Sequence, residues 1–281
     1  MIDGFDYKEP SCALCGGKEF YYPDKDAPTE RIPVGRIIER LDDFLGKNRT
    51  AEARAHLEYW AKEAEALRDK QGELTVVNEL IGVYRKAGEQ ELAFSACDRA
   101  LEIIGLLSAE ASPSAATVYL NIATAYKAFG KAASALPLYE KTLEIYRKHY
   151  DETNPIFAGL YNNFALALVD EKEFGRAEEL YKKAAAVLES ERNLQSEPHA
   201  KPDAAITYVN LAHLYYDTGK PKDTITDCMF KAYGLLTDET VAQNGYLAFV
   251  YEKCYPSFEF FGYELVAKEL KEKSEALYAG A

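Results

Sequence analysis

The strongest constraint in this sequence is a turn that recurs along the chain about every 42 residues. The segment from Tyr126 to Gly130 is its clearest copy. Six positions mark the turn, at intervals of 40, 42, 42, 47 and 43 residues: Asn48, Gly88, Gly130, Lys172, Gly219 and Gly262. Self-similarity at such a period is typical of repeat proteins, whose units bury their apolar faces only by stacking on neighbours. The sequence therefore predicts one stack of similar units, although 281 residues would suffice for two compact domains.

Residues with helical spacing lie on both sides of the turns. Before the turns, three segments share an aromatic residue, an asparagine, an apolar pair and another large residue: Tyr119-x-Asn121-Ile122-Ala123-x-x-Tyr126, Tyr161-x-Asn163-Phe164-Ala165-x-x-Leu168 and Tyr208-x-Asn210-Leu211-Ala212-x-x-Tyr215. After the turns come Ala135, Tyr139 and Leu143, and then Ala177, Tyr181 and Ala184. Spacings of three and four place each set on one face of an α-helix. Each unit is therefore a helix before the turn, the first helix, and a helix after it, the second helix.

These residues and their period resemble the tetratricopeptide repeat (TPR), in the long form found in kinesin light chains. The ordinary repeat has 34 residues, so 42 adds about two helical turns and keeps each buried face in phase. We expect Pro113, Pro155 and Pro202 to precede the next first helix by a few residues. The resemblance covers residues 36 to 281 and is strongest in the three central repeats. Pro256, within the last expected first helix, predicts a kink.

The resemblance implies an all-α fold, a right-handed α-α superhelix (TPR solenoid) of five to six helix pairs. It also divides the chain into two parts. Residues 34–281 form the expected solenoid, and residues 1–33 form an N-terminal, knuckle-like segment that does not follow the repeat.

Composition limits the classes of partner and the location. The chain is 48% apolar, but no run approaches the roughly 18 to 20 apolar residues of a membrane helix, and the N-terminus has no signal-peptide pattern. A cytoplasmic location is the expectation. A formal net charge of −13 disfavours nucleic acid, which requires a basic surface. The acidity either keeps a helical array soluble or attracts a basic partner.

Three asparagines fall at the same position of successive first helices: Asn121, Asn163 and Asn210. Stacked helix pairs curve so that the first helices line a concave groove, where TPR proteins usually hold extended peptides. A row of amides can both donate to and accept from a peptide backbone. Asparagine is also disfavoured in mid-helix, so propensity does not explain it. Kinesin light chains carry a similar row and use it on cargo peptides. The alternative is that these amides bond to the neighbouring repeat and fix its packing.

Further inward positions complete the predicted peptide-binding site. They are Asn162, Lys127, Leu166, His213 and Tyr216. The predicted groove is basic toward one end, at Arg85, Lys86 and Lys127, and acidic toward the other, at Asp170 and Asp217. This pattern predicts a ligand with a few apolar anchors and a gradient of charge.

Cys12 and Cys15 form a C-x-x-C pair followed by two glycines, as in a zinc knuckle. A structural zinc normally needs four ligands, and no second C-x-x-C pair exists in the sequence. Three interpretations stay open for this segment: a metal-free hairpin, a zinc site and a redox pair. The other three cysteines, Cys97, Cys228 and Cys254, fall on predicted helices and are expected to be small buried apolar residues.

No enzyme signature is found in the sequence. The four histidines are isolated, and the sequence has no H-E-x-x-H, P-loop, dinucleotide-binding or G-x-S-x-G motif. The chain is therefore expected to be not an enzyme but a noncovalent scaffold or adaptor that binds a protein or an extended peptide without a cofactor. The alternatives are a cytoplasmic receptor for a signalling peptide and a zinc or redox factor acting through Cys12 and Cys15.

Overall fold

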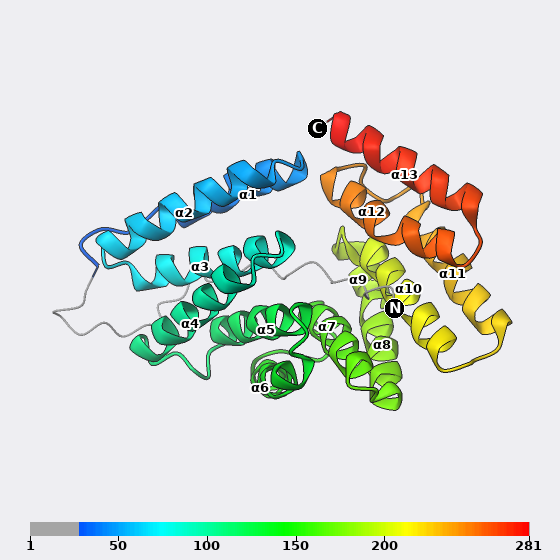
Figure 1. The fold of residues 1–281 in the computed structure, drawn as a ribbon, viewed down its shortest axis with the longest axis horizontal. Coiled ribbons are helices and arrows are strands. Elements are labelled where there is room, and N and C mark those ends of the chain that lie inside the picture. The colour runs from blue at the N-terminus through cyan, green and yellow to red at the C-terminus, as the bar shows by residue number, and fades with distance from the viewer. Residues whose placement is uncertain (1–27, 281) are drawn as a thin grey trace. The chain divides into compact units, whose positions relative to one another are not determined.

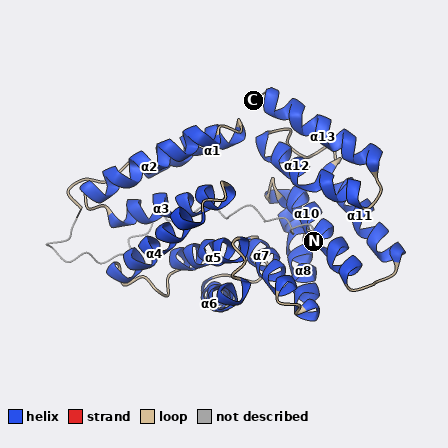
Figure 2. Ribbon diagram, in the orientation of Figure 1, coloured by secondary structure: helices blue, strands red, loops and turns tan. Residues whose placement is uncertain are grey.

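The computed structural model describes residues 28–280, and all regular secondary structure within this range is α-helical (Figure 2). The described chain divides into two compact units at residue 150. We refer to residues 28–149 as the N-terminal unit and to residues 150–280 as the C-terminal unit. Each unit contains three of the helix pairs expected from the sequence. The predicted all-α class of paired helices is confirmed, with six pairs in the described residues.

The N-terminal unit contains three helix pairs, coloured blue to green in Figure 1. Its first helices are α1, α3 and α5, and α2, α4 and α6 are the second helices. Their bounds are α1 Val34–Gly46, α2 Thr50–Ala66, α3 Lys70–Lys86, α4 Gln90–Leu106, α5 Pro113–Ala128 and α6 Ala132–His149. Each first helix packs against its own second helix, and α3 also contacts α1, α2 and α5. This pattern joins consecutive pairs into one apolar core.

The C-terminal unit also has three pairs and, between the first two, one short additional helix (Figure 1). Its first helices are α7, α10 and α12, and its second helices are α8, α11 and α13. Their bounds, with the additional helix α9, are α7 Ile156–Asp170, α8 Phe174–Leu188, α9 Glu191–Ser196, α10 Ala200–Asp217, α11 Lys222–Leu236, α12 Gly245–Phe260 and α13 Glu264–Ala279. Helix α10 contacts α7, α8 and α12 as well as its partner α11.

All six predicted turn positions adopt the left-handed backbone conformation. Their φ angles are 55° at Asn48, 73° at Gly88, 72° at Gly130, 61° at Lys172, 68° at Gly219 and 85° at Gly262. A left-handed residue after a helix lets the next backbone N–H turn back to a carbonyl of the last turn. Lys131 N donates to Tyr126 O at 2.8 Å, and Lys220 N donates to Tyr215 O at 2.8 Å. The repeated turn is therefore the same helix-ending hydrogen-bond pattern in each pair.

Small and aromatic residues fill fixed positions between the helices. Ala123, Ala165 and Ala212 each lie seven residues before their left-handed residue, and none has solvent-exposed surface. Tyr139 and Tyr181 each lie nine residues after it and are at most 1% exposed. Because interiors are closely packed, a methyl group at the alanine positions allows the helices to approach, and the tyrosine rings fill the wider spaces between them.

The prolines lie closer to the helix starts than their positions in the sequence predicted. Pro113 is the first residue of α5, Pro155 is the residue just before α7, and Pro202 lies inside the first turn of α10. The expectation that Pro113 and Pro202 precede their helices by a few residues was wrong. Their positions are still favourable, because the N–H groups of a first helical turn have no acceptor within the helix. Pro256 lies within α12, as expected, and Pro137 lies within α6.

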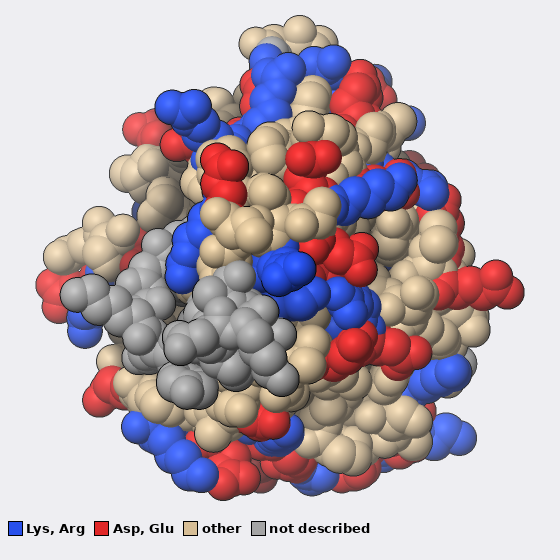
Figure 3. Space-filling view, turned by 90° about the vertical axis from the view of Figure 1, so that its left-hand side faces the viewer, with Lys and Arg blue, Asp and Glu red and all other residues tan. Residues whose placement is uncertain are grey.

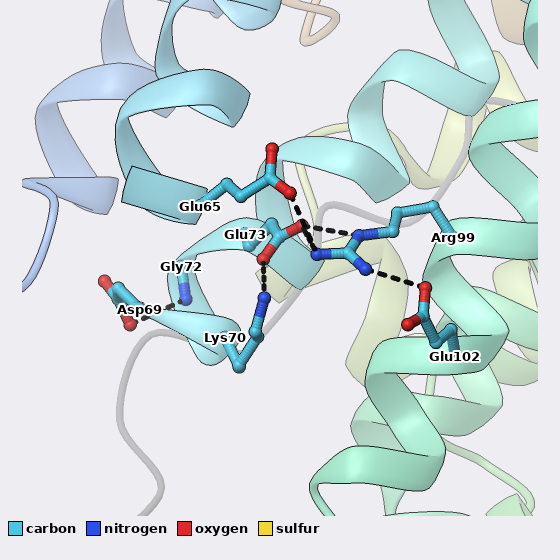
Figure 4. Close-up of polar contacts among 7 residues, drawn as sticks. All are labelled: Glu65, Asp69, Lys70, Gly72, Glu73, Arg99 and Glu102. Carbon is cyan, nitrogen blue, oxygen red and sulfur yellow. Dashed lines mark hydrogen bonds and ion pairs between the residues drawn. The ribbon is translucent and has the colours of Figure 1, made fainter. Parts of the chain in front are cut away.

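A buried carboxylate joins α2, α3 and α4 (Figure 4). The side chain of Glu73 is 3% exposed and lies 2.8 Å from Lys70 Nζ and 2.6 Å from Arg99 Nη2. The same guanidinium reaches Glu102 at 2.7 Å and Glu65 at 3.7 Å. A buried charge is costly unless it is paired and hydrogen-bonded, and Glu73 has two cationic donors. This network links three consecutive helices of the N-terminal unit.

Asp69 joins the segment before α1 to the start of α3, and Figure 4 shows its bond to Gly72 of α3. Asp69 is 2% exposed, and its carboxylate accepts a hydrogen bond from Gly72 N at 3.1 Å, which caps α3. The other oxygen accepts from Ile32 N at 3.0 Å. Thr29 N donates to Leu67 O at 3.0 Å in the same junction. A Cβ atom on Gly72 would lie 2.4 Å from Asp69 Oδ2 and 2.6 Å from Ile32 Cγ1. Only glycine fits there without displacing the cap.

We expect Gly72→Ala to lower the free energy of unfolding by about 2 kcal/mol, because the added methyl overpacks the cap. Gly105→Ala is the matched control, since nothing lies within 4 Å of its Cβ position in the neighbouring helix α4. The control should be neutral, or stabilising by up to about 1 kcal/mol. Urea denaturation of both variants checks this, and equal effects of the two substitutions would contradict the proposed packing.

Candidate functional site

The sequence-predicted site residues lie on α5, α7 and α10, the first helices of three pairs. Asn121, Asn163 and Asn210 each lie nine residues before the left-handed residue of their repeat. Equal distances from equivalent helix ends give the three amides the same helical phase. Asn121 belongs to the N-terminal unit, and Asn163 and Asn210 belong to the C-terminal unit. The structure therefore offers two separate candidate surfaces, one on each unit.

In the N-terminal unit, Asn121 bonds to the preceding first helix. Its side chain is 1% exposed, and its Nδ2 donates to Asn78 Oδ1 on α3 at 3.0 Å. Asn78 lies ten residues before its turn instead of nine, yet it is the residue that meets Asn121. The Oδ1 atom of Asn121 is also buried but accepts no hydrogen bond from the described residues. Asn121 thus joins two repeats through its donor, while its acceptor stays unpaired within the described chain.

In the C-terminal unit, neighbouring asparagines on α7 have different partners. Asn162 Nδ2 donates to Thr207 Oγ1 on α10 at 2.9 Å and to Ala158 O at 3.1 Å. Asn163 Nδ2 donates to Gly159 O of its own helix, at 3.1 Å. The buried Oδ1 atoms of both asparagines accept no hydrogen bond from residues 28–280. Asn162, and not Asn163, therefore joins these two repeats.

Three other predicted residues are buried. Lys127 is 9% exposed, Leu166 is 4% exposed and Asn210 is 3% exposed. Leu166 and Asn210 lie on adjacent first helices of the C-terminal unit, α7 and α10, and Lys127 lies near the end of α5. A ligand would reach these side chains only after the groups covering them move.

His213 and Tyr216 belong to an aromatic cluster that α10 forms with α12. His213 Nε2 lies 2.8 Å from Ser257 Oγ, and its ring centroid lies 5.4 Å from Phe260 and 4.9 Å from Phe261. Tyr216 is 54% exposed. Burial lowers the pKa of His213 below its ordinary value, against the opposing negative charge of Asp217. The histidine therefore acts as a neutral hydrogen-bonding group at the edge of an exposed patch.

Phe260 and Phe261 were not among the sequence-predicted residues. Both come just before Gly262, the last of the repeated turns, and Phe260 holds the position that Asp217 holds in the preceding repeat. This shared position in the repeat could have identified Phe260 from the sequence, and Phe261 is its neighbour.

The predicted metal ligands Cys12 and Cys15 lie outside the described residues, so the zinc interpretation stays a prediction. Within residues 28–280, no group of three or more His, Cys, Asp or Glu side chains is placed to hold a metal ion. Cys97, Cys228 and Cys254 are buried, as the sequence predicted. Burial raises the pKa of Cys228 to about 11 and that of Cys254 to about 12, which disfavours the nucleophilic thiolate.

Charge is distributed unequally between the two units. Residues 28–149 carry 18 acidic and 17 basic side chains, whereas residues 150–280 carry 22 acidic and 13 basic ones. The formal net charges are therefore −1 and −9. On the face drawn in Figure 3, side chains of both signs lie interspersed among uncharged ones. No helix of the described residues has the length and apolar character required to cross a bilayer.

The comparisons with known proteins agree with the helical pairs. The tetratricopeptide repeat family model matches residues 73–148. The crystal structure of BtubC (BKLC) from P. vanneervenii is similar over 89% of this chain and 92% of its own, with a TM-score of 0.52 and 20% sequence identity. No curated protein matches the chain. The predicted recognition of tetratricopeptide repeats is confirmed by the match over residues 73–148, and at 20% identity the structural likeness shows the fold alone.

Two further solved structures come from a Podosopora anserina protein whose description names a kinesin light chain and nearly identical TPR-like repeats. One of them is the structure of a variant with a single substitution. Both are 18% identical to this chain and cover 74% of it and 95% of their own length, with TM-scores of 0.48 and 0.47.

We expect Asn121→Ala to cost more stability than Asn163→Ala. The first substitution removes a hydrogen bond between helices and leaves Asn78 Oδ1 unpaired, at a cost of about 1–2 kcal/mol. The second removes a bond within one helix together with an unpaired buried acceptor, and it should cost less than about 1 kcal/mol. Free energies of unfolding from urea titrations provide the test. A larger loss for Asn163→Ala would contradict these pairings.

His213 should make stability depend on pH below its ordinary pKa of 6.5. Because the folded-state pKa is lower, the unfolded chain takes up the proton first as pH falls. The full contribution of His213 to stability is present above pH 6.5. It declines as the pH falls from 6.5 to the folded-state pKa. Unfolding measured between about pH 7.5 and 5.5 should show a smaller decline for His213→Gln than for the parent. An NMR titration that placed the pKa of His213 above 6.5 would contradict this assignment.

Proposed function

Because residues 73–148 match the tetratricopeptide repeat model and the fold is a series of paired helices, we propose that the chain binds a partner protein noncovalently by holding an extended segment against its first helices. The fold itself is that of a protein-interaction scaffold in general. The finer assignment concerns where the segment binds. It places the peptide along α7 and α10 of the C-terminal unit, with Asn162, Asn163, Leu166 and Asn210 beneath it. The exposed Tyr216 lies near the end of α10.

The observation that carries this proposal is the repeated amide with an unused acceptor. Asparagine recurs at one position of three first helices, although it is a poor residue in a helix interior. Hydrogen bonds within the described chain explain only part of this recurrence. The Oδ1 atoms of Asn121 and Asn163 accept no hydrogen bond from the described residues. Buried polar atoms are almost always paired, and the exceptions require an explanation. A peptide backbone N–H is a donor of the right kind.

The proposed binding mode requires movement of the protein. Asn163 and Asn210 are 1% and 3% exposed, so a ligand backbone reaches their amides only when neighbouring side chains shift. The cost of that shift lowers the apparent affinity, as it does for any protein whose binding-competent state is a minor one. The mode therefore favours ligands that add apolar or charged contacts to their backbone hydrogen bonds.

Alanine at both Asn163 and Asn210 should strongly reduce capture of the partner from a native cell extract, while circular dichroism shows unchanged helicity. The matched control is Glu179→Ala with Lys183→Ala, two exposed side chains on the second helix α8. This control should retain the partner. Recovery of the same proteins by the parent chain and by the asparagine variant would reject the amides as the binding site. For a peptide derived from the captured partner, we expect roughly tenfold weaker binding to the asparagine variant.

A further inference from the structure

Three aromatic rings at the ends of α10 and α12 stand nearly perpendicular to one another. The Tyr216 and Phe260 centroids are 5.2 Å apart with the ring planes at 84°, and Phe260 and Phe261 are 5.0 Å apart at 78°. Tyr216 and Phe261 are 5.9 Å apart at 74°. Tyr216 is 54% exposed and Phe260 is 44% exposed. The rings form the walls of a corner that solvent reaches, which we name the aromatic corner.

A carboxylate and two helix ends lie beside the aromatic corner. Asp217, the last residue of α10, is exposed and close enough to His213 to oppose the effect of burial on its pKa. The side chain of Asp217 makes no ion pair or hydrogen bond with any described residue. The corner also lies where two helices end, and the carbonyl end of a helix dipole favours a cation. The C-terminal unit as a whole has nine more acidic than basic residues.

Several other aromatic rings of the described chain have a charged side chain of the same chain lying over them. Four examples, with the distance from the lysine nitrogen to the ring centroid, are Lys141 over Tyr119 at 3.9 Å, Lys131 over Phe94 at 4.2 Å, Lys231 over Tyr208 at 4.4 Å and Lys253 over Phe249 at 5.5 Å. Among residues 28–280, no such cation lies over the rings of the aromatic corner. The nearest lysine along the chain from Tyr216, Lys220, lies over the ring of Tyr215 at 5.9 Å and pairs with Glu178 at 3.7 Å.

We propose that the aromatic corner binds an arginine side chain of the partner protein, with the guanidinium against Tyr216 or Phe260 and its N–H groups donating to Asp217. Arginine fits better than lysine, because its planar group stacks on a ring while its edge pairs with a carboxylate. This inference deepens the proposed function and rests on it, since it assigns one anchor of the bound segment. It adds a basic residue to the chemistry of the partner, at a place separate from the asparagine amides.

The probe is the peptide acetyl-Gly-Gly-Arg-Gly-Gly-amide, titrated into the full chain with isotope-labelled aromatic residues and followed by NMR. We expect saturable shifts of the Tyr216 and Phe260 ring signals. The same peptide with citrulline, the neutral analogue of arginine, should produce none. Asp217→Asn and Phe260→Ala should each weaken binding roughly threefold to tenfold. The control Asp223→Asn removes the same charge from α11, and the control Phe230→Ala removes another exposed ring, 63% exposed.

Several results would overturn the proposal. Equal shifts with the citrulline peptide would show that charge is not recognised. Equal weakening by Asp223→Asn would show only general attraction to an acidic unit. Tighter binding of a peptide with trimethyl-lysine would assign the aromatic corner to a quaternary ammonium group. The variant with alanine at Asn163 and Asn210 should bind the arginine peptide unchanged, so failure of the amide site and failure of the aromatic corner are distinguishable.

Discussion

The left-handed residue between the two helices of each pair is the constraint on which the rest of the structure depends. It reverses the chain within a few residues, and the hydrogen bond that follows it fixes where the first helix ends. Since helical phase is counted from that end, residues equally far from the turn occupy equivalent faces in every pair. The distance from the turn therefore sets the positions of the alanines between helices, the buried tyrosines and the recurring asparagines. A slip of one residue at a turn would rotate a whole face by about 100°.

The turns could be predicted from the sequence because a left-handed residue is often glycine, which recurs here at a regular interval. Four of the six turns use glycine, for which this conformation carries no steric cost, and the interval between them identifies Asn48 and Lys172 as their equivalents. Two further left-handed residues, Arg68 and Ser108, follow second helices of the N-terminal unit and were not predicted. Neither residue type is distinctive for this conformation. The short helix α9 was missed for a similar reason, because six residues are too few to show a helical period.

The sequence predicted which residues share a face in the candidate site. It did not predict the hydrogen-bond partners of those residues. The period gave the common face of Asn121, Asn163 and Asn210, but it could not show which amides meet a neighbouring helix. Asn162 and Asn163 are adjacent in sequence, and only Asn162 reaches α10. Which of the two does so depends on how the helices cross, and that angle is set by packing throughout the core. The aromatic corner was missed in part for the same reason, since its rings meet only once two helix ends have converged.

The unequal charge of the two units bears on how a partner arrives. Long-range attraction acts before any contact forms, and it speeds diffusional encounter with an oppositely charged molecule. At physiological ionic strength it is screened over about 8 Å, so its contribution falls as salt rises. With a net charge of −9 on residues 150–280 and −1 on residues 28–149, a cationic partner is steered to the C-terminal unit. The association rate there is correspondingly sensitive to salt, whereas encounters with the N-terminal unit depend on it little.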